Sequence, residues 1–350
     1  MTKPPRFRRF PLTVQTAYSD LLARAQEDAI LDLGGTPILR ERGGRQYWYA
    51  VQRLAGRTAE RYLGPDSAEL RARVERAKKI REDAAKRERQ RGQLTRMCRE
   101  GGLPSVDAQT GKILHALSKA GLFRLRAVLV GTHAFRCYPA VLGVDLPEAR
   151  AATEDIDVAA FHSISVALDD HLDPALADAL RRISPFVARP GLHAQATAWR
   201  DEESGALVEL LTPNQGPDRE EPLALPAIGV HAVPLRFLDY LIHRPIQAVA
   251  LYRAGVLVNV PQPARYAIHK LIVATRRTAA AAAKARKDIE QAAALIRVLC
   301  EDRPDELEDA FVEARGRGRS WRESLDAGSR RLPKDAKEAL GAVVETTFKA

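Results

Sequence analysis

The spacing of apolar residues changes along the first third of the chain. Residues 12–30 repeat apolar side chains every three or four positions, Ala17 and Leu21 among them, which predicts an amphipathic helix. Three later segments instead alternate polar and apolar positions and are separated by turn residues, which predicts a small antiparallel sheet. These segments are residues 36–41, 46–52 and 58–63.

A long, highly charged helix is predicted from Ser67 to Glu100. Ser67 is a suitable N-cap, and Gly101 with Gly102 ends the helix. Over residues 71–99, twelve Lys or Arg residues stand against four Asp or Glu residues, so this segment carries most of the formal net charge of +10. A basic surface attracts polyanions, which makes nucleic acid a candidate partner. The alternative is a solvated helix with ion pairs between residues four positions apart.

The middle of the chain mixes helical and strand patterns. The expected elements are a helix at 108–120, a buried strand at 127–130, a helix from Ala134 to about Val141, and strands at 156–161, 195–200 and 206–211. The last two strands flank a polar turn, which predicts a hairpin. This order predicts a mixed α/β fold. The remaining chain is predicted to be helical at 264–275, 280–299, 304–314 and 335–348.

We therefore predict a mixed α/β protein in four parts. A helix and a small β meander occupy residues 1–65, and a long basic helix or linker occupies 66–105. A sheet with flanking helices follows at 106–262, and a helical domain at 263–350. No segment approaches the ~20 uncharged apolar residues that a membrane span requires, and the three cysteines show neither a disulfide framework nor a zinc pattern. We expect no membrane association and a cytoplasmic location.

A strand-to-helix turn at Gly131 is the first candidate for ligand binding. Leu129 and Val130 end the buried strand, and a helix follows Gly131 and Thr132. Glycine lets the backbone approach a ligand closely, and free N–H groups at a helix start suit a phosphate. The same turn is common for purely structural reasons. His133 is interpreted as a helix-start residue with a local hydrogen bond.

Asp155 and Asp157 form a D-x-D pair on a predicted strand. Residues two apart on a strand point to the same face, with Cα atoms about 6.6 Å apart. Two neighbouring carboxylates repel each other unless a cation lies between them, and oxygen ligands are those that Mg²⁺ prefers. The alternative is a pair of acids that caps a strand end or forms surface ion pairs.

Glu209 is a third acid, placed within an apolar strand where an unpaired carboxylate is unfavourable. If this strand neighbours that of Asp155 and Asp157, the three carboxylates form one cluster. Three carboxylates can hold two divalent ions about 3.5–4 Å apart. The sequence therefore predicts a two-magnesium site.

The Gly131 turn, the D-x-D pair and the later acid, in this order, resemble the nucleotidyltransferases of the DNA polymerase β superfamily. More narrowly, residues 110–300 look like bacterial nucleotidyltransferase-fold proteins related to toxins of type IV toxin–antitoxin and abortive-infection systems. The resemblance implies a nucleotidyltransferase-fold sheet, an NTP substrate and two Mg²⁺ ions, with Gly131 and Thr132 at the phosphates. The third acid is usually Asp in the superfamily and is Glu209 here.

Charged residues on two C-terminal helices extend this resemblance. The toxin-like family has a lysine on one helix and a Lys-Asp pair that opens the next, which Lys270 and Lys287-Asp288 match. By resemblance, Lys270 neutralises triphosphate charge with help from Lys287 or Arg277. Asp288 then orients a base or acts near the acceptor hydroxyl. The alternatives are solvated lysines and an Asp288 salt bridge within its own helix.

The leading hypothesis is a Mg²⁺-dependent nucleotidyltransferase that moves NMP from an NTP to a hydroxyl and releases pyrophosphate. The acceptor is an RNA 3′ end such as tRNA, a protein or a small molecule, and a toxin-like role implies an antitoxin partner. A second hypothesis is a catalytically inactive member of the fold that binds nucleic acid or a protein partner. A sugar-nucleotide glycosyltransferase also uses D-x-D, but that class lacks the Gly131-Thr132 turn and the third acid.

Overall fold

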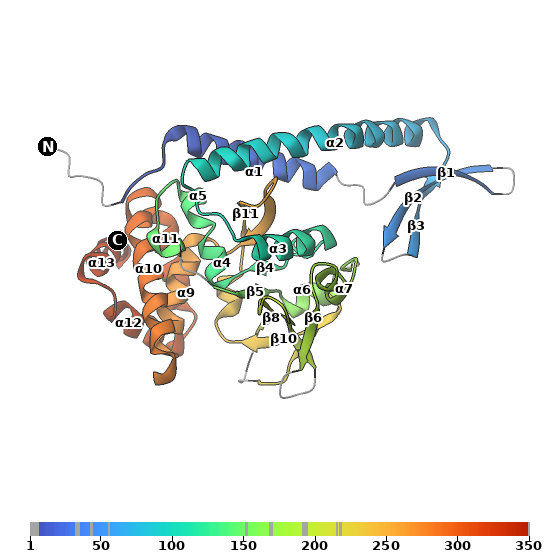
Figure 1. Cartoon of the computed structure of the whole chain (residues 1–350). Coiled ribbons are helices and arrows are strands. Elements are labelled where there is room, and N and C mark those ends of the chain that lie inside the picture. Colours follow the sequence, from blue (N-terminus) through green and yellow to red (C-terminus); the bar gives the residue numbers. More distant parts are fainter. Residues whose placement is uncertain are drawn as a thin grey trace.

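The computed structural model describes residues 7–31, 36–42, 45–54, 57–150, 153–167, 171–190, 195–214, 216 and 219–348. Figure 1 shows an N-terminal pair of helices with a small sheet at one end, a central sheet and a C-terminal group of helices. The mixed α/β fold class predicted from the sequence is confirmed. Among the described residues, no helix is long and apolar enough to cross a membrane.

Two helices, α1 (Leu12–Leu31) and α2 (Ala68–Glu100), run side by side at the N-terminal end (Figure 1). The predicted N-cap is present, because the backbone N–H of Leu70 donates to Ser67 Oγ at 3.2 Å. A small apolar core joins these helices to a later hairpin and includes Tyr18, Leu21, Cys98, Val249 and Leu251. The predicted three-stranded antiparallel sheet is also present, as β1 (Thr36–Arg42), β2 (Arg45–Leu54) and β3 (Arg57–Pro65).

A mixed sheet lies at the centre of the molecule. Its strands are β4 (Val128–Leu129), β5 (Asp155–Ala159), β6 (Phe186–Pro190), β7 (Ala196–Asp201), β8 (Leu207–Pro213), β9 (Leu223–Leu225) and β10 (Val230–Leu235). β5, β8 and β10 are parallel neighbours, and β4 extends the sheet beyond β5 in the antiparallel direction. The predicted hairpin is formed by β7 and β8. The sheet thus places β5 beside β8, although more than forty residues separate them.

Strand β5 has two different faces. Ile156 and Val158 are fully buried in the main core, whereas Asp155 is exposed and Asp157 is half-buried. Side chains alternate along a strand, so burial of the two apolar residues directs both aspartates to the opposite face. The strand ends at Ala159, two residues earlier than predicted, because a short helix begins at His162.

Short helices surround the sheet. They are α3 (Ala108–Ala120), α4 (Gly131–Phe135), α5 (Tyr138–Leu142), a 3₁₀ helix (Pro147–Arg150), α6 (His162–Ala167), α7 (Leu176–Arg181) and α8 (Leu238–Leu241). A separate hairpin of β11 (Ile246–Ala250) and β12 (Val256–Val260) packs against α1 and α3.

The single helix predicted from Ala134 to Val141 is wrong. Two short helices, α4 and α5, occupy this segment, with Pro139 in the first turn of α5. Proline has no backbone N–H, and inside a helix its ring clashes with the carbonyl four residues earlier, which here is that of Phe135. The chain therefore ends one helix at Phe135 and begins another, and α4 starts at Gly131 itself.

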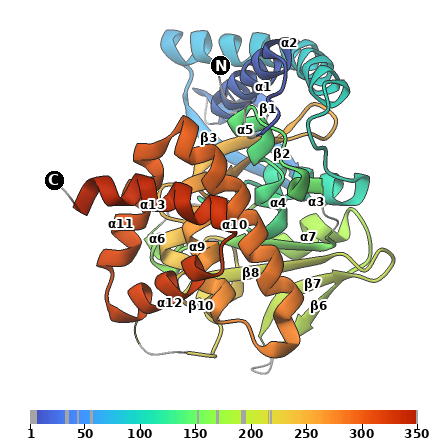
Figure 2. The same cartoon turned by 90° about the vertical axis from the view of Figure 1, so that its left-hand side faces the viewer.

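The C-terminal helices gather on one side of the central sheet (Figure 2). They are α9 (Pro263–Thr275), a 3₁₀ turn (Ala279–Ala281), α10 (Ala282–Asp302), α11 (Pro304–Gly316), α12 (Arg319–Arg330) and α13 (Lys334–Phe348). Helix α12 was not expected from the sequence. It packs closely on α9, since a side chain at Gly328 would collide with the backbone of Leu271. One apolar core continues from Ile113 to Val344 and joins sheet and helices.

Candidate active site

The pairing of β5 with β8 brings three carboxylates together. The parallel register sets Asp157 opposite Glu209 and Asp155 opposite Leu207. Residues directly opposite each other on neighbouring strands point to the same side of the sheet. Asp155, Asp157 and Glu209 therefore lie on one face, as the sequence analysis required for a shared site.

The turn at Gly131 lies against the same face. The backbone N–H of Val130 donates to the carbonyl oxygen of Asp157 at 2.9 Å, which fixes the turn beside β5. Gly131 has a φ of +64°, a backbone conformation that residues other than glycine rarely adopt. A Cβ at this position would also collide with the carboxylate of Asp157. Glycine is thus required here both for backbone conformation and for space.

Burial and mutual repulsion act on two of the three carboxylates. Burial raises the pKa of Asp157 above its ordinary value, and the charge of Asp155 adds to this. Burial likewise raises the pKa of Glu209, and both aspartates add to this. Neighbouring cations work in the opposite direction, and Lys284 lowers the pKa of both Asp157 and Glu209. The face therefore carries negative charge that its protein neighbours only partly compensate.

Lys287 connects α10 to the helix start beside the carboxylates. Its Nζ donates to Thr132 Oγ1 at 3.0 Å. Burial lowers the pKa of Lys287, and the nearby charge of Lys270 adds to this. A cation and a hydroxyl thus stand together at the N-terminal end of α4, next to Gly131, in the position predicted for phosphate contacts.

Asp288 holds two other predicted cations in place. The carboxylate is buried, and its two oxygens accept from Lys270 Nζ at 2.5 Å and from Arg277 Nε at 3.0 Å. The salt bridge within α10 that the sequence left open is not the one formed. Since both oxygens of Asp288 are engaged, its geometry is that of a residue that orients Lys270 and Arg277.

Two residues that the sequence analysis did not single out for the site belong to this arrangement. Tyr266 donates its hydroxyl to the carbonyl oxygen of Gly131 at 3.0 Å, and Lys270 Nζ lies 5.2 Å from the centre of its ring. Lys284 is the cation that acts on both Asp157 and Glu209. A helical signal was available for each, because Tyr266 precedes Lys270, and Lys284 precedes Asp288, by four positions on one helix face.

His133 does not form the local hydrogen bond expected from the sequence. The side chain is fully buried, and within the described part of the chain neither ring nitrogen has a hydrogen-bond partner. Burial lowers the pKa of His133 to about 4, and the charge of Arg136 contributes. His133 is therefore a neutral residue packed behind the Gly131 turn.

The donor set of the site fits Mg²⁺ in its chemistry. Across the described ranges, no group of three or more His, Cys, Asp or Glu side chains converges closely enough to hold a metal ion. Asp155, Asp157 and Glu209 thus share a face without meeting at one point. All their donors are carboxylate oxygens, and a divalent cation would relieve the repulsion that raises the pKa of Asp157 and Glu209.

Comparison with known protein families identifies the family to which this region of the chain belongs. A family model described as Nucleotidyltransferase matches residues 108–316, more than half of the chain. The chain belongs to this nucleotidyltransferase family. The matched region runs from α3 to the end of α11 and contains every candidate residue described above.

The N-terminal part of the chain lies outside the nucleotidyltransferase match. A second family model, described as a domain of unknown function (DUF6788), matches residues 15–72, from α1 through the small sheet to the first turn of α2. No curated protein and no solved structure matches the chain.

Proposed function

We propose that this nucleotidyltransferase transfers a nucleoside monophosphate from an NTP to an acceptor hydroxyl in a Mg²⁺-dependent reaction. The observation that carries the proposal is the shared face of Asp155, Asp157 and Glu209, which lies beside the Gly131 turn. Three acids, a phosphate-binding turn and a set of cations on α9 and α10 are the groups that phosphoryl-type transfer requires.

Each group has a role in this proposal. The backbone at Gly131, the hydroxyl of Thr132 and the ammonium of Lys287 contact the β- and γ-phosphates. Lys270 and Arg277, oriented by Asp288, neutralise the charge of the triphosphate. This role is favourable because fixed cations stabilise the charge that develops on a leaving pyrophosphate without having to reorganise.

In this proposal the three carboxylates bind the metal ions, and one of them accepts the proton of the acceptor hydroxyl. Asp155, Asp157 and Glu209 would bind two Mg²⁺ ions, which supply activation of the acceptor oxygen and stabilisation of the leaving group. The acceptor oxygen forms a bond to the α-phosphorus, and the bond from that phosphorus to the bridging oxygen breaks. The proton of the acceptor goes to Glu209, the carboxylate that β8 contributes to this face.

The proposal also extends to the acceptor and to the biological role. The acceptor hydroxyl is that of an RNA 3′ end such as tRNA, of a protein or of a small molecule. A toxin-like action with an antitoxin partner rests on the family resemblance described from the sequence. Incubation with each labelled NTP in the presence of cellular RNA or protein identifies the acceptor by the fraction that becomes labelled.

Asp155→Ala tests the transfer reaction. Asp155 is exposed, so its loss leaves the core intact, and we expect turnover of labelled NTP to fall by about 10³-fold or more. Asp178→Ala, which removes an exposed aspartate on α7, is the matched control and keeps full activity. Full activity in Asp155→Ala would contradict the proposal. Absence of any Mg²⁺-dependent thermal shift with every NTP would favour the catalytically inactive alternative.

A further inference from the structure

Helix α2 extends well beyond the helix that supports it. Near the C-terminal end of α1, Asp28 pairs with Arg87 at 2.5 Å and with Arg91 at 2.9 Å. Helix α1 ends three residues later, at Leu31, so residues 68–83 of α2 continue for about 24 Å past it. The small sheet lies at the far end (Figure 1), where Trp48 Nε1 donates to Asp66 at 2.9 Å.

Two groups of cations stand on opposite sides of α2 among the side chains that the structure describes between residues 86 and 96. On the inner side, Arg87 and Arg91 are paired with Asp28. On the outer side, Lys86, Arg89 and Arg96 are exposed and form no ion pair or hydrogen bond within the described residues. They are three and seven positions apart, with Gln93 between, so they share one helix face. The outer face of α2, defined here by Lys86, Arg89, Gln93 and Arg96, is therefore a basic stripe, with one exposed acid, Glu100, four positions after Arg96 on the same face.

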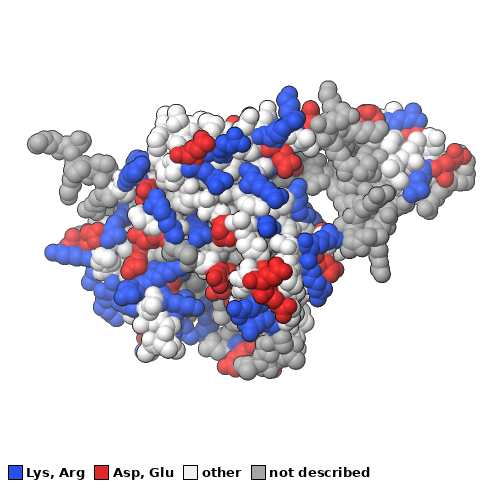
Figure 3. Space-filling view, in the orientation of Figure 1, with Lys and Arg blue, Asp and Glu red and all other residues white. Residues whose placement is uncertain are grey.

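The composition of this stripe favours a polyanion over an apolar protein surface. Protein interfaces depend on aromatic and aliphatic anchors that fill pockets on the partner. Among the large apolar side chains that are exposed in the described part of the chain, Met97 alone lies on α2. Figure 3 shows Lys and Arg interspersed with Asp and Glu over the upper part of the molecule, where α1 and α2 lie.

We propose that the outer face of α2 binds the phosphate backbone of a nucleic acid. Phosphodiester strands carry a regular series of negative charges, and a basic helix face gains affinity from them by counterion release. This binding does not depend on the transfer reaction proposed above, because none of the stripe residues belongs to that site.

The dependence of nucleic-acid affinity on salt concentration tests whether the outer face of α2 contacts phosphates. The probes are a labelled 20-base-pair RNA duplex, a DNA duplex and a single-stranded RNA, each titrated with the full chain between 50 and 200 mM salt, roughly the range over which phosphate contacts alter affinity. We expect the logarithm of affinity to fall with the logarithm of salt concentration, with a slope of about −2 to −3 for three contacts. The three probes distinguish RNA from DNA and duplex from single strand.

The variant Lys86→Glu, Arg89→Glu, Arg96→Glu should bind at least about tenfold more weakly and with a smaller slope. The control Arg322→Glu, Lys334→Glu, Lys337→Glu changes net charge equally on exposed C-terminal positions and should stay within about twofold of the parent chain. A Gln version of the stripe variant serves if the Glu version fails to fold. The thermal shift with NTP reports the active site separately and should be unchanged in all variants.

Three results would overturn the proposal. An equal loss in the control would show that total charge, and not the outer face of α2, sets the affinity. Binding that does not respond to salt would exclude phosphate contacts by this face. Competition by polyglutamate as effective as that by nucleic acid would assign the stripe to an acidic protein instead.

Discussion

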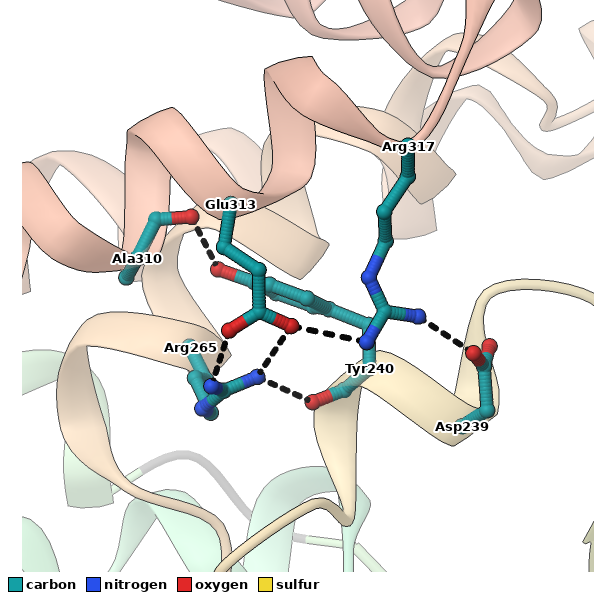
Figure 4. A network of polar contacts seen from close by, with 6 residues as sticks. All are labelled: Asp239, Tyr240, Arg265, Ala310, Glu313 and Arg317. Carbon is teal, nitrogen blue, oxygen red and sulfur yellow. Dashed lines mark hydrogen bonds and ion pairs between the residues drawn. The ribbon is translucent and has the colours of Figure 1, made fainter.

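Two clusters of charged residues in the nucleotidyltransferase domain differ in how completely their charges are paired. The first is the candidate active site. The second, called here the α9–α11 network, consists of Asp239, Tyr240, Arg265, Glu313 and Arg317 (Figure 4). Both use residues of α9, and both combine buried with partly exposed side chains, so burial alone does not separate them.

Every charge in the α9–α11 network has an opposite partner. Arg265 donates to both oxygens of Glu313 and to the carbonyl oxygen of Tyr240 at 3.2 Å. Arg317 donates to Glu313 at 2.7 Å and pairs with Asp239, and the Tyr240 hydroxyl donates to the carbonyl oxygen of Ala310 at 2.7 Å (Figure 4). The network therefore ties α8, α9 and α11 together.

The pKa values of the acids move in opposite directions in the two clusters. Burial acts to raise the pKa of Glu313, but the hydrogen bonds of Arg265 and Arg317 hold it below its ordinary value. Burial raises the pKa values of Asp157 and Glu209, and nearby carboxylates add to this, Asp155 at Asp157 and both aspartates at Glu209. A paired cluster stabilises the fold, whereas a cluster of like charges destabilises it and is retained where a ligand supplies the missing charge.

Arg265→Met should produce the larger effect on stability. The substitution removes a cation that is almost fully buried and leaves Glu313 without one of its two arginine partners. Breaking a buried pair costs about 3–5 kcal/mol, and Glu313 is about one-third exposed, so we expect a loss of about 2–3 kcal/mol. Chemical denaturation measures it. Arg319→Met, at an exposed pair with Glu323, should leave stability essentially unchanged, because solvent screens an exposed ion pair.

Asp157→Asn should change stability in the opposite direction. It removes a carboxylate whose charged form is disfavoured by burial and by Asp155, so the free energy of unfolding should rise by about 0.5–2 kcal/mol at pH 7 while NTP turnover is lost. Because the pKa of Asp157 is raised in the folded state, the parent chain loses stability as pH rises through that pKa. The gain should therefore vanish in acid and grow toward neutral pH.

The control for this variant is Asp309→Asn, at an exposed position in the middle of α11, which should change stability little at either pH. Denaturation at pH 3 and pH 7 separates the outcomes. A destabilised Asp157→Asn chain would show that Asp157 is already paired in the fold, and the contrast between the two clusters would fail.

The smallest effect is expected for Lys284→Met, which should shift the acidic limb of the pH–rate profile by a fraction of a pH unit. Lys284 lowers the pKa of Asp157 and Glu209, so removing it should raise both and move the acidic limb of the pH–rate profile to higher pH. Arg286→Met, also exposed on α10, removes a charge that acts on neither carboxylate and should leave the limb in place. Equal shifts in the two variants would show that the effect is one of net charge.

Local patterns predicted most of the elements that carry the site. Periodicity located α1, α2, α3, α9 and the strand that holds Asp155 and Asp157, because the relevant contacts repeat within a few residues. Several elements were not predicted, namely strands β6, β9, β10, β11 and β12 and helices α6, α7, α8 and α12. Strands β9 and β10 are short and form a local hairpin, which joins the sheet where β10 pairs with the more distant β8. Helix α12 is mostly polar, and its buried residues are Leu325 and Gly328.

The amino-acid sequence by itself determined that Asp155 and Asp157 share a strand face, that a glycine turn precedes a helix, and that basic residues concentrate between residues 71 and 99. These properties follow from chain geometry within a few residues. The tertiary structure alone decided that β8 sets Glu209 beside Asp157, and that Lys284 and Lys287 approach from α10. Such partners are separated by about 50 to 155 positions, and their meeting depends on strand order and helix packing, which no local spacing encodes.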